Sequence, residues 1–175
     1  IGHLVVAVEA RATLNLDEVW LLVAHTPWQK TGRGVTDAEH RLAMARAAVV
    51  GLDGLVASDF EFDPPGPTYT VDTLERLVRL RPEVMPTLIL GADAAAGVGT
   101  WHRSADVAAL AEIAVVDRPG CGSTTPATLA VPQLDVSSTG IRARVQTGRP
   151  IDVLCPPGVV SLISELGLYD GGDGS

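Results

Sequence analysis

Short apolar segments alternate with helical patterns along nearly the whole chain, and this alternation restricts the fold more than any other feature of the sequence. The expected strands are the apolar runs 19–24, 55–59, 87–91 and 113–116, with a short strand near 129–136. The expected helices span about 3–14, 36–50, 70–80, 104–111, 139–147 and 156–167. Strands that are apolar on both faces are typical of parallel sheets covered by helices on both sides. The sequence therefore predicts an α/β fold with a parallel sheet between helical layers.

Three of the expected helices carry local signals. Thr36-Asp37-Ala38-Glu39 is a capping box, in which Thr36 accepts a free backbone N–H and Glu39 reaches back to another. Ser104 is expected to cap the helix 104–111. The helix 70–80 has an apolar face, made of Val71, Leu74, Leu77 and Val78.

Length and composition narrow the class of protein. A chain of 175 residues suits one domain, here 1–170, with the glycine-rich residues 171–175 as a loose tail. The net charge of −8 argues against binding to duplex nucleic acid, and no apolar run is long enough to span a membrane. Two cysteines far apart, Cys121 and Cys155, fit a reduced cytoplasmic protein. The histidine and cysteine spacings do not form a zinc site, and neither a G-x-S-x-G elbow nor a Walker A loop occurs.

The unusual polar residues follow the expected strands. In a parallel sheet, ligands bind at the carboxyl ends of the strands, where the strand order reverses. The polar segments there are 25–30, 67–70, 91–93 with Trp101, Arg118, and 136–142. Their gathering at one edge of the sheet indicates a nucleotide pocket.

One of these segments combines hydroxyl groups with a helix start. Ser137, Ser138 and Thr139 begin the expected helix, and Arg142 follows one turn later. The free N–H groups and the dipole of a helix start attract phosphate, and an arginine adds charge. An ordinary helix cap with a surface arginine is the alternative, and three hydroxyls favour anion binding over it.

Three further residues have both a functional and a structural interpretation, and the role of a fourth, His3, stays open. Asp93, two residues past a strand, could accept ribose hydroxyls, help to hold a metal or cap the next helix. Trp101 could stack on a planar ring or pack half-buried. Lys30, the only lysine, is either a charge for phosphate or a solvated side chain. The neighbours of His3 do not decide its role.

Taken together, these residues resemble the bacterial nicotinate-nucleotide adenylyltransferases, a family of the nucleotidylyltransferase superfamily, along nearly the whole chain. The matching motifs are Gly2-His3-Leu4, Pro27-Trp28-Gln29-Lys30, the segment 66–74 (G-P-T-Y-T-V-D-T-L), Leu90-Gly91-Ala92-Asp93 with Trp101, Arg118-Pro119-Gly120, the segment 136–142 (V-S-S-T-G-I-R) and Gly167-Leu168-Tyr169. The S-S-T-x-x-R part belongs to the wider superfamily, whereas G-P-T-Y-T-x-D-T-L with G-A-D and W is specific to this family. The W-Q-K sequence resembles the actinobacterial branch.

The resemblance implies a Rossmann-like domain that transfers AMP from ATP to nicotinate mononucleotide with Mg²⁺, giving deamido-NAD and pyrophosphate. It implies catalytic roles for His3, Lys30 and Arg142, and no resident protein metal site. The implied ATP-binding residues are His3, Gly91, Asp93, Arg118, Ser137, Ser138, Thr139 and Arg142. The implied residues for nicotinate mononucleotide are Lys30, Tyr69, Thr70 and Trp101, the last by stacking. The expected partners are these two nucleotides, with neither nucleic acid nor membrane, and a homo-oligomer is left open.

The chain departs from the family pattern at its start. The family has a strand and a G-G-T-F-D-P-x-H segment ahead of residue 1, and Ile1 stands at the x of its H-x-G-H motif. The first histidine, the glycine loop and the first strand are therefore expected to be truncated from this chain. Two alternatives remain: a related adenylyltransferase with another acceptor (nicotinamide mononucleotide or phosphopantetheine), and a non-catalytic nucleotide-binding module.

Overall fold

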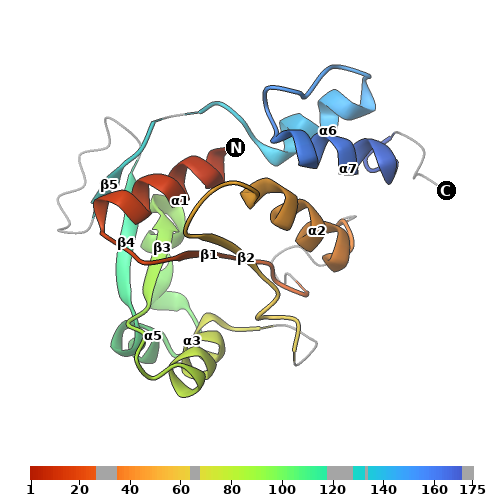
Figure 1. The fold of residues 1–175 in the computed structure, drawn as a ribbon. Coiled ribbons are helices and arrows are strands. Elements are labelled where there is room, and N and C mark those ends of the chain that lie inside the picture. Colours follow the sequence, from red (N-terminus) through yellow and green to blue (C-terminus); the bar gives the residue numbers. More distant parts are fainter. Residues whose placement is uncertain (27–34, 64–67, 118–127, 133, 171–175) are drawn as a thin grey trace.

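The computed structural model describes residues 1–26, 35–63, 68–117, 128–132 and 134–170 (Figure 1). The helices are α1 (Gly2–Thr13), α2 (Ala38–Val49), α3 (Thr70–Leu80), α4 (Ala92–Ala96), the 3-10 helix η2 (Val98–Thr100), α5 (Ser104–Leu110), α6 (Ser138–Gln146) and α7 (Pro157–Glu165). The strands are β1 (Val19–Leu22), β2 (Leu55–Ser58), β3 (Thr87–Gly91), β4 (Glu112–Asp117) and β5 (Thr128–Ala130). The predicted alternation of strands and helices is therefore present.

All strand pairs are parallel, as predicted, but the strands form two sheets. β1 pairs with β2, and β3, β4 and β5 pair in that order. In the described part of the chain, this pairing leaves one edge of β1 and one edge of β3 without a partner strand. Strand β5 is shorter than the predicted 129–136, because Pro132 lacks the N–H that a ladder requires.

Helices cover both faces of the three-stranded sheet. On β3, Leu88 packs against the buried residues of α3 and α5, and the next residue, Ile89, packs against the cluster that contains Ala10 of α1. Neighbouring side chains of a strand point to opposite faces. Ile89 also contacts the cluster of Ala7, Val19 and Leu55, so apolar side chains join the two sheets where hydrogen bonds do not.

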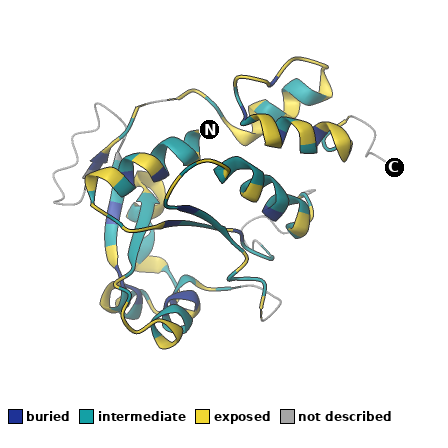
Figure 2. Cartoon of the chain, viewed as in Figure 1, coloured by how far each residue is buried: buried dark blue, intermediate teal, exposed yellow. Residues whose placement is uncertain are grey.

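Helix α7 packs on α2 rather than on a strand, and α6 joins the same apolar cluster. Ile151, Cys155, Val159 and Ile163 form a buried cluster with Met44, Ala47 and Ala48 of α2 and with Ile141 and Val145 of α6. Elsewhere the surfaces of α6 and α7 are largely exposed (Figure 2). No helix among the described residues is long and apolar enough to cross a membrane.

Two predicted helix caps are wrong. The N-cap of α2 is Asp37, whose Oδ1 accepts the backbone N–H of Glu39 at 2.8 Å, and Thr36 instead donates to the hydroxyl of Tyr169. The N-cap of α5 is Arg103, and the Ser104 hydroxyl donates to the carbonyl of Gly99. The Thr36 hydroxyl is therefore taken by a contact 133 residues away, and the Ser104 hydroxyl by the preceding turn.

Candidate functional site

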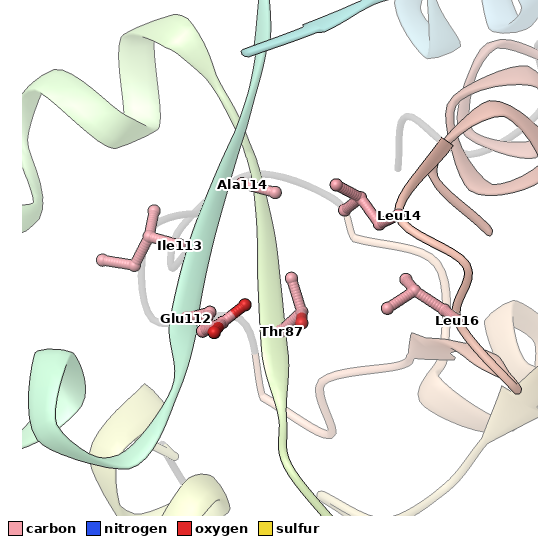
Figure 3. Close-up of a pocket in the computed structure, with 6 residues that line it drawn as sticks. All are labelled: Leu14, Leu16, Thr87, Glu112, Ile113 and Ala114. Carbon is pink, nitrogen blue, oxygen red and sulfur yellow. The ribbon is translucent and has the colours of Figure 1, made fainter. Parts of the chain in front are cut away.

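The amino ends and the carboxyl ends of the strands differ in the residues that surround them. Thr87 and Glu112 begin β3 and β4, and they line a small hollow of about 120 Å³ with Leu14, Leu16, Ile113 and Ala114 (Figure 3). This hollow is therefore at the amino edge of the sheet and offers mainly apolar walls. The candidate site residues that the structure describes follow the opposite, carboxyl ends of the strands or begin helices.

The residue His3 lies at the far end of α1 from this hollow. Leu14 follows the last turn of α1 and lines the hollow, and α1 has 12 residues. A helix of that length rises by about 18 Å. The exposed His3 ring, in the first turn, is therefore well separated from the amino edge.

The structure brings together two predicted motifs that lie about thirty residues apart in the sequence. The Tyr69 ring stacks on the His102 ring, with the centroids 4.6 Å apart and the planes at 38°. Tyr69 is the N-cap of α3, so Thr70 begins that helix, and Trp101 immediately precedes His102. The half-buried Trp101 and Thr70 are thus held in one region, where an indole face and a hydroxyl suit a planar polar ring.

The start of α6 gathers the predicted hydroxyls and the arginine. The Ser137 hydroxyl oxygen accepts the N–H of Gly140 at 3.1 Å, so this serine caps the helix. Ser138 and Thr139 remain exposed in the first turn. Arg142 turns back toward them, because its Nη2 donates to Thr139 Oγ1 at 3.4 Å, and its guanidinium carbon lies 6.0 Å from the Tyr169 ring centroid. Backbone N–H groups, hydroxyls and a cation at one helix end fit a phosphate.

Asp93 is exposed in the first turn of α4, and it does not cap that helix. Gly91, the last residue of β3, is the N-cap, because α4 begins directly where the strand ends. The Asp93 carboxylate therefore faces solvent at a helix start. A carboxylate there can accept hydroxyl groups of a ribose or contribute one oxygen to a cation.

Two candidate residues, Lys30 and Arg118, lie outside the described residues. Within the described part, no hydrogen bond or ion pair connects His3, the Trp101 region and the start of α6 to one another. The described residues also contain no group of three His, Cys, Asp or Glu side chains that could hold a metal ion.

Sequence reasoning missed His102 and Arg103, which follow Trp101 directly, and Glu75, which pairs with Arg103. Arg103 Nη2 donates to Glu75 Oε1 of α3, and its Nε donates to Asp106 Oδ2 of α5, both at 2.6 Å. These two hydrogen bonds, first that to Glu75, raise the pKa of Arg103 above its ordinary value. The adjacency of His102 and Arg103 to Trp101 was a signal, but the pairing with Glu75 spans 28 residues and has no local signature.

Comparison with known proteins gives one consistent result. The cytidylyltransferase-like family model matches residues 1–144. The chain is 40% identical to a probable nicotinate-nucleotide adenylyltransferase of Arthrobacter sp., over 97% of this chain and 85% of that protein. It is 42% identical to a probable nicotinate-nucleotide adenylyltransferase of Streptomyces coelicolor, over 97% of this chain and 94% of that protein.

The fold also has a match among solved structures. It resembles that of the nicotinic acid mononucleotide adenylyltransferase of Plasmodium falciparum complexed with NaAD, with a TM-score of 0.76 and 19% identity. The match covers 96% of this chain and 90% of that one. At this identity the likeness concerns the fold, and it agrees with the predicted Rossmann-like nucleotidylyltransferase arrangement.

Proposed function

The chain belongs to the family of nicotinate-nucleotide adenylyltransferases, and we propose from this that it transfers AMP from ATP to nicotinate mononucleotide, giving deamido-NAD and pyrophosphate. The observation that carries this proposal is identity of about 40% over nearly the whole chain to relatives with that name. This reaction is a step in the biosynthesis of NAD. The two cysteines, far apart in sequence, favour the cytoplasm as the compartment of the protein.

The geometry supports a division of the site into two parts. The start of α6, with Ser137, Ser138, Thr139 and Arg142, suits the phosphates of ATP. The region of Thr70 and Trp101 suits the nicotinate ring, with Tyr69 beside it. Each part matches one substrate of the proposed reaction.

The reaction in this proposal is a direct displacement. A phosphate oxygen of nicotinate mononucleotide forms a bond to the α-phosphorus of ATP, and the bond from that phosphorus to the bridging oxygen breaks, so that pyrophosphate leaves. The protein contributes alignment and neutralisation of charge, not a covalent intermediate. His3, Lys30, Arg118 and Arg142 are the side chains that we assign to phosphate, with Lys30, His3 and Arg142 acting on the reacting groups.

The proposal includes Mg²⁺, and the donor set fits an ion that arrives with ATP. Mg²⁺ is usually held by substrate phosphates and one or two carboxylates rather than by a complete protein cage. Asp93 supplies such a carboxylate at the end of β3, and no group of three ligands occurs in the described residues. When bound, the ion would neutralise phosphate charge, while Asp93 holds either the ion or the ribose and Gly91 lets the backbone approach ATP closely.

Pyrophosphate release tests the proposed function. The protein as its gene encodes it is incubated with ATP, Mg²⁺ and one acceptor, and we expect release with nicotinate mononucleotide and far less with nicotinamide mononucleotide or phosphopantetheine. Faster release with either other acceptor would identify a related adenylyltransferase. Binding of ATP without release with any acceptor would identify a nucleotide-binding module instead.

A further inference from the structure

The residue after His102 has an uncommon backbone conformation. Arg103 has φ 51° and ψ 46°, in the left-handed region that residues other than glycine rarely adopt. Such a conformation persists only where surrounding contacts hold it. The Arg103 side chain makes two such contacts.

The guanidinium of Arg103, two residues after Trp101, joins two helices. It donates to Glu75 on α3 and to Asp106 on α5, each at 2.6 Å. The two helices lie side by side (Figure 1) over a shared apolar cluster of Val71, Leu74, Val107 and Ala111. The ion pair therefore adds a polar connection at the exposed rim of an interface that is already packed.

A second contact holds the same segment to the same helix. The His102 ring stacks on the Tyr69 ring at the N-terminus of α3. Trp101 thus precedes two consecutive residues that are both attached to α3, one by ring stacking and one by an ion pair. Thr70 lies between these two attachment points on α3, directly after Tyr69 and five residues before Glu75.

We propose that Arg103 is a positioning residue for the nicotinate ring: by joining Glu75 of α3 to Asp106 of α5, it fixes Trp101 relative to Thr70. This inference rests on the proposed function, and it assigns to Arg103 and Glu75 a role in substrate affinity, not in phosphate chemistry. The stacking of His102 on Tyr69 restricts the same segment from the other side.

The first measurement needs no ligand. In protein that carries Trp20→Phe and Trp28→Phe, Trp101 is the only tryptophan, and acrylamide quenching of its fluorescence reports how tightly it is held. We expect Arg103→Ala and Glu75→Gln to increase the quenching, and Arg103→Lys, which can still pair with one carboxylate, to increase it less. Unchanged quenching in Arg103→Ala would overturn the proposal, whatever the protein's substrate.

The second measurement is calorimetric titration with nicotinate mononucleotide and with ATP. Loss of alignment in Arg103→Ala should raise the Kd of nicotinate mononucleotide roughly tenfold and leave that of ATP unchanged. Glu75→Gln should have a similar effect, and the double variant should be little worse than either single one. Equal weakening of both ligands would assign Arg103 to general stability and overturn the proposal. Absence of binding by the unsubstituted protein would instead contradict the proposed function, while the quenching result would still stand.

Two variants complete the comparison. Arg103→Gly removes the guanidinium and relieves the left-handed backbone, so affinity close to that of the original protein would show that the backbone, not the ion pair, matters, and would overturn the proposal. Arg81→Ala is the matched control, because Arg81 follows the other end of α3 and makes an ion pair with Glu83 at similar exposure. We expect Arg81→Ala to leave both ligand affinities unchanged.

Discussion

At the scale of single residues, Arg142 is the described side chain most directly assigned to phosphate. It is exposed and turns toward Thr139 at the start of α6. Because charge develops on phosphate oxygens during displacement, Arg142→Ala should lower kcat/KM by about 2–4 kcal/mol in steady-state assays. Arg142→Lys should recover only part of this loss, since lysine lacks the planar fork of the guanidinium.

The control for Arg142 separates charge at the site from charge in general. Arg149 is also exposed and lies beyond the other end of α6. Arg149→Ala should keep normal kcat/KM, and neither variant should move the Tm by much, because exposed charges contribute little to folding. Normal kinetics in Arg142→Ala would reduce the start of α6 to an ordinary cap.

A second prediction at this scale concerns Trp101. Trp101→Ala should weaken nicotinate mononucleotide binding by about 1–2 kcal/mol through lost stacking and contact area, with ATP affinity nearly unchanged. Trp101→Phe keeps an aromatic face and should lose less. Calorimetric titration checks both ligands, and an equal loss for ATP would make Trp101 a packing residue or an adenine platform.

The residue types of this site were predictable from the sequence, whereas the contacts that hold these residues in place were not. The roles of Thr70 and Trp101 were predicted from the resemblance of the segment 66–74, and of Gly91-Ala92-Asp93 with Trp101, to the family. The stacking of Tyr69 on His102 and the Arg103 ion pairs join segments far apart in the chain. Such contacts depend on how α3 and α5 pack, which no local pattern encodes.

At the scale of elements, the hydroxyl groups of two serines at the start of α6 have different roles. The Ser137 hydroxyl oxygen accepts the N–H of Gly140, whereas the Ser138 side chain is exposed. Ser137→Ala should therefore lower the free energy of unfolding by about 1 kcal/mol, measured by urea denaturation. Ser138→Ala should leave stability unchanged and lower kcat/KM. The reverse pattern would contradict the assignment of the cap.

The bounds of a helix or strand were predictable where the pattern of apolar residues alone determined them. The apolar run 87–91 became β3, and the residues Thr70–Leu80 became α3 with Val71 and Leu74 buried as predicted. The prediction was wrong where a hydroxyl had a choice of partners. Thr36 lies one residue before the real N-cap of α2, and its hydroxyl bonds to Tyr169, 133 residues away.

At the scale of the whole molecule, the packing of α7 on α2, in a cluster that α6 joins, supports our proposal that residues 1–170 form one domain. Ile163, 5% exposed, lies in the cluster between α7 and α2. Ile163→Ala should lower the free energy of unfolding by about 2–5 kcal/mol, because it removes buried methyl groups and leaves a cavity. Circular dichroism and tryptophan fluorescence should still give coincident denaturation curves. All three tryptophans lie outside α6 and α7, so separate transitions would indicate two independent units.

The division into two sheets was not predictable from strand patterns, because periodicity predicts a strand but not its neighbours. The apolar runs of β1 and β3 each indicate a strand buried on both faces. In the structure Ile89 of β3 and Leu21 of β1 pack against the same buried cluster, but the two strands form no backbone ladder. Which strands pair therefore depends on how the helical and strand layers assemble.

Cys155 provides a chemical probe of the contact between α7 and α2. Its thiol is buried in the same cluster as Ile163, and burial raises the pKa of Cys155 above its ordinary value. Because only the thiolate reacts, iodoacetamide should label Cys155 slowly in the native protein and rapidly in denaturant, measured by mass spectrometry in a Cys121→Ser background. Ile163→Ala should accelerate native labelling by loosening the cluster, whereas the distant Arg81→Ala should not.

The same shift predicts how stability depends on pH. An unfolded cysteine ionises at its ordinary pKa of about 8.5, whereas the folded thiol stays neutral to higher pH. The contribution of Cys155 to the free energy of unfolding is therefore complete below that pKa and is lost as the pH rises through it toward the folded value. Urea denaturation between neutral pH and alkaline pH should show this decline, and Cys155→Ala should reduce it. An equally steep decline in Cys155→Ala would assign the pH dependence to other groups.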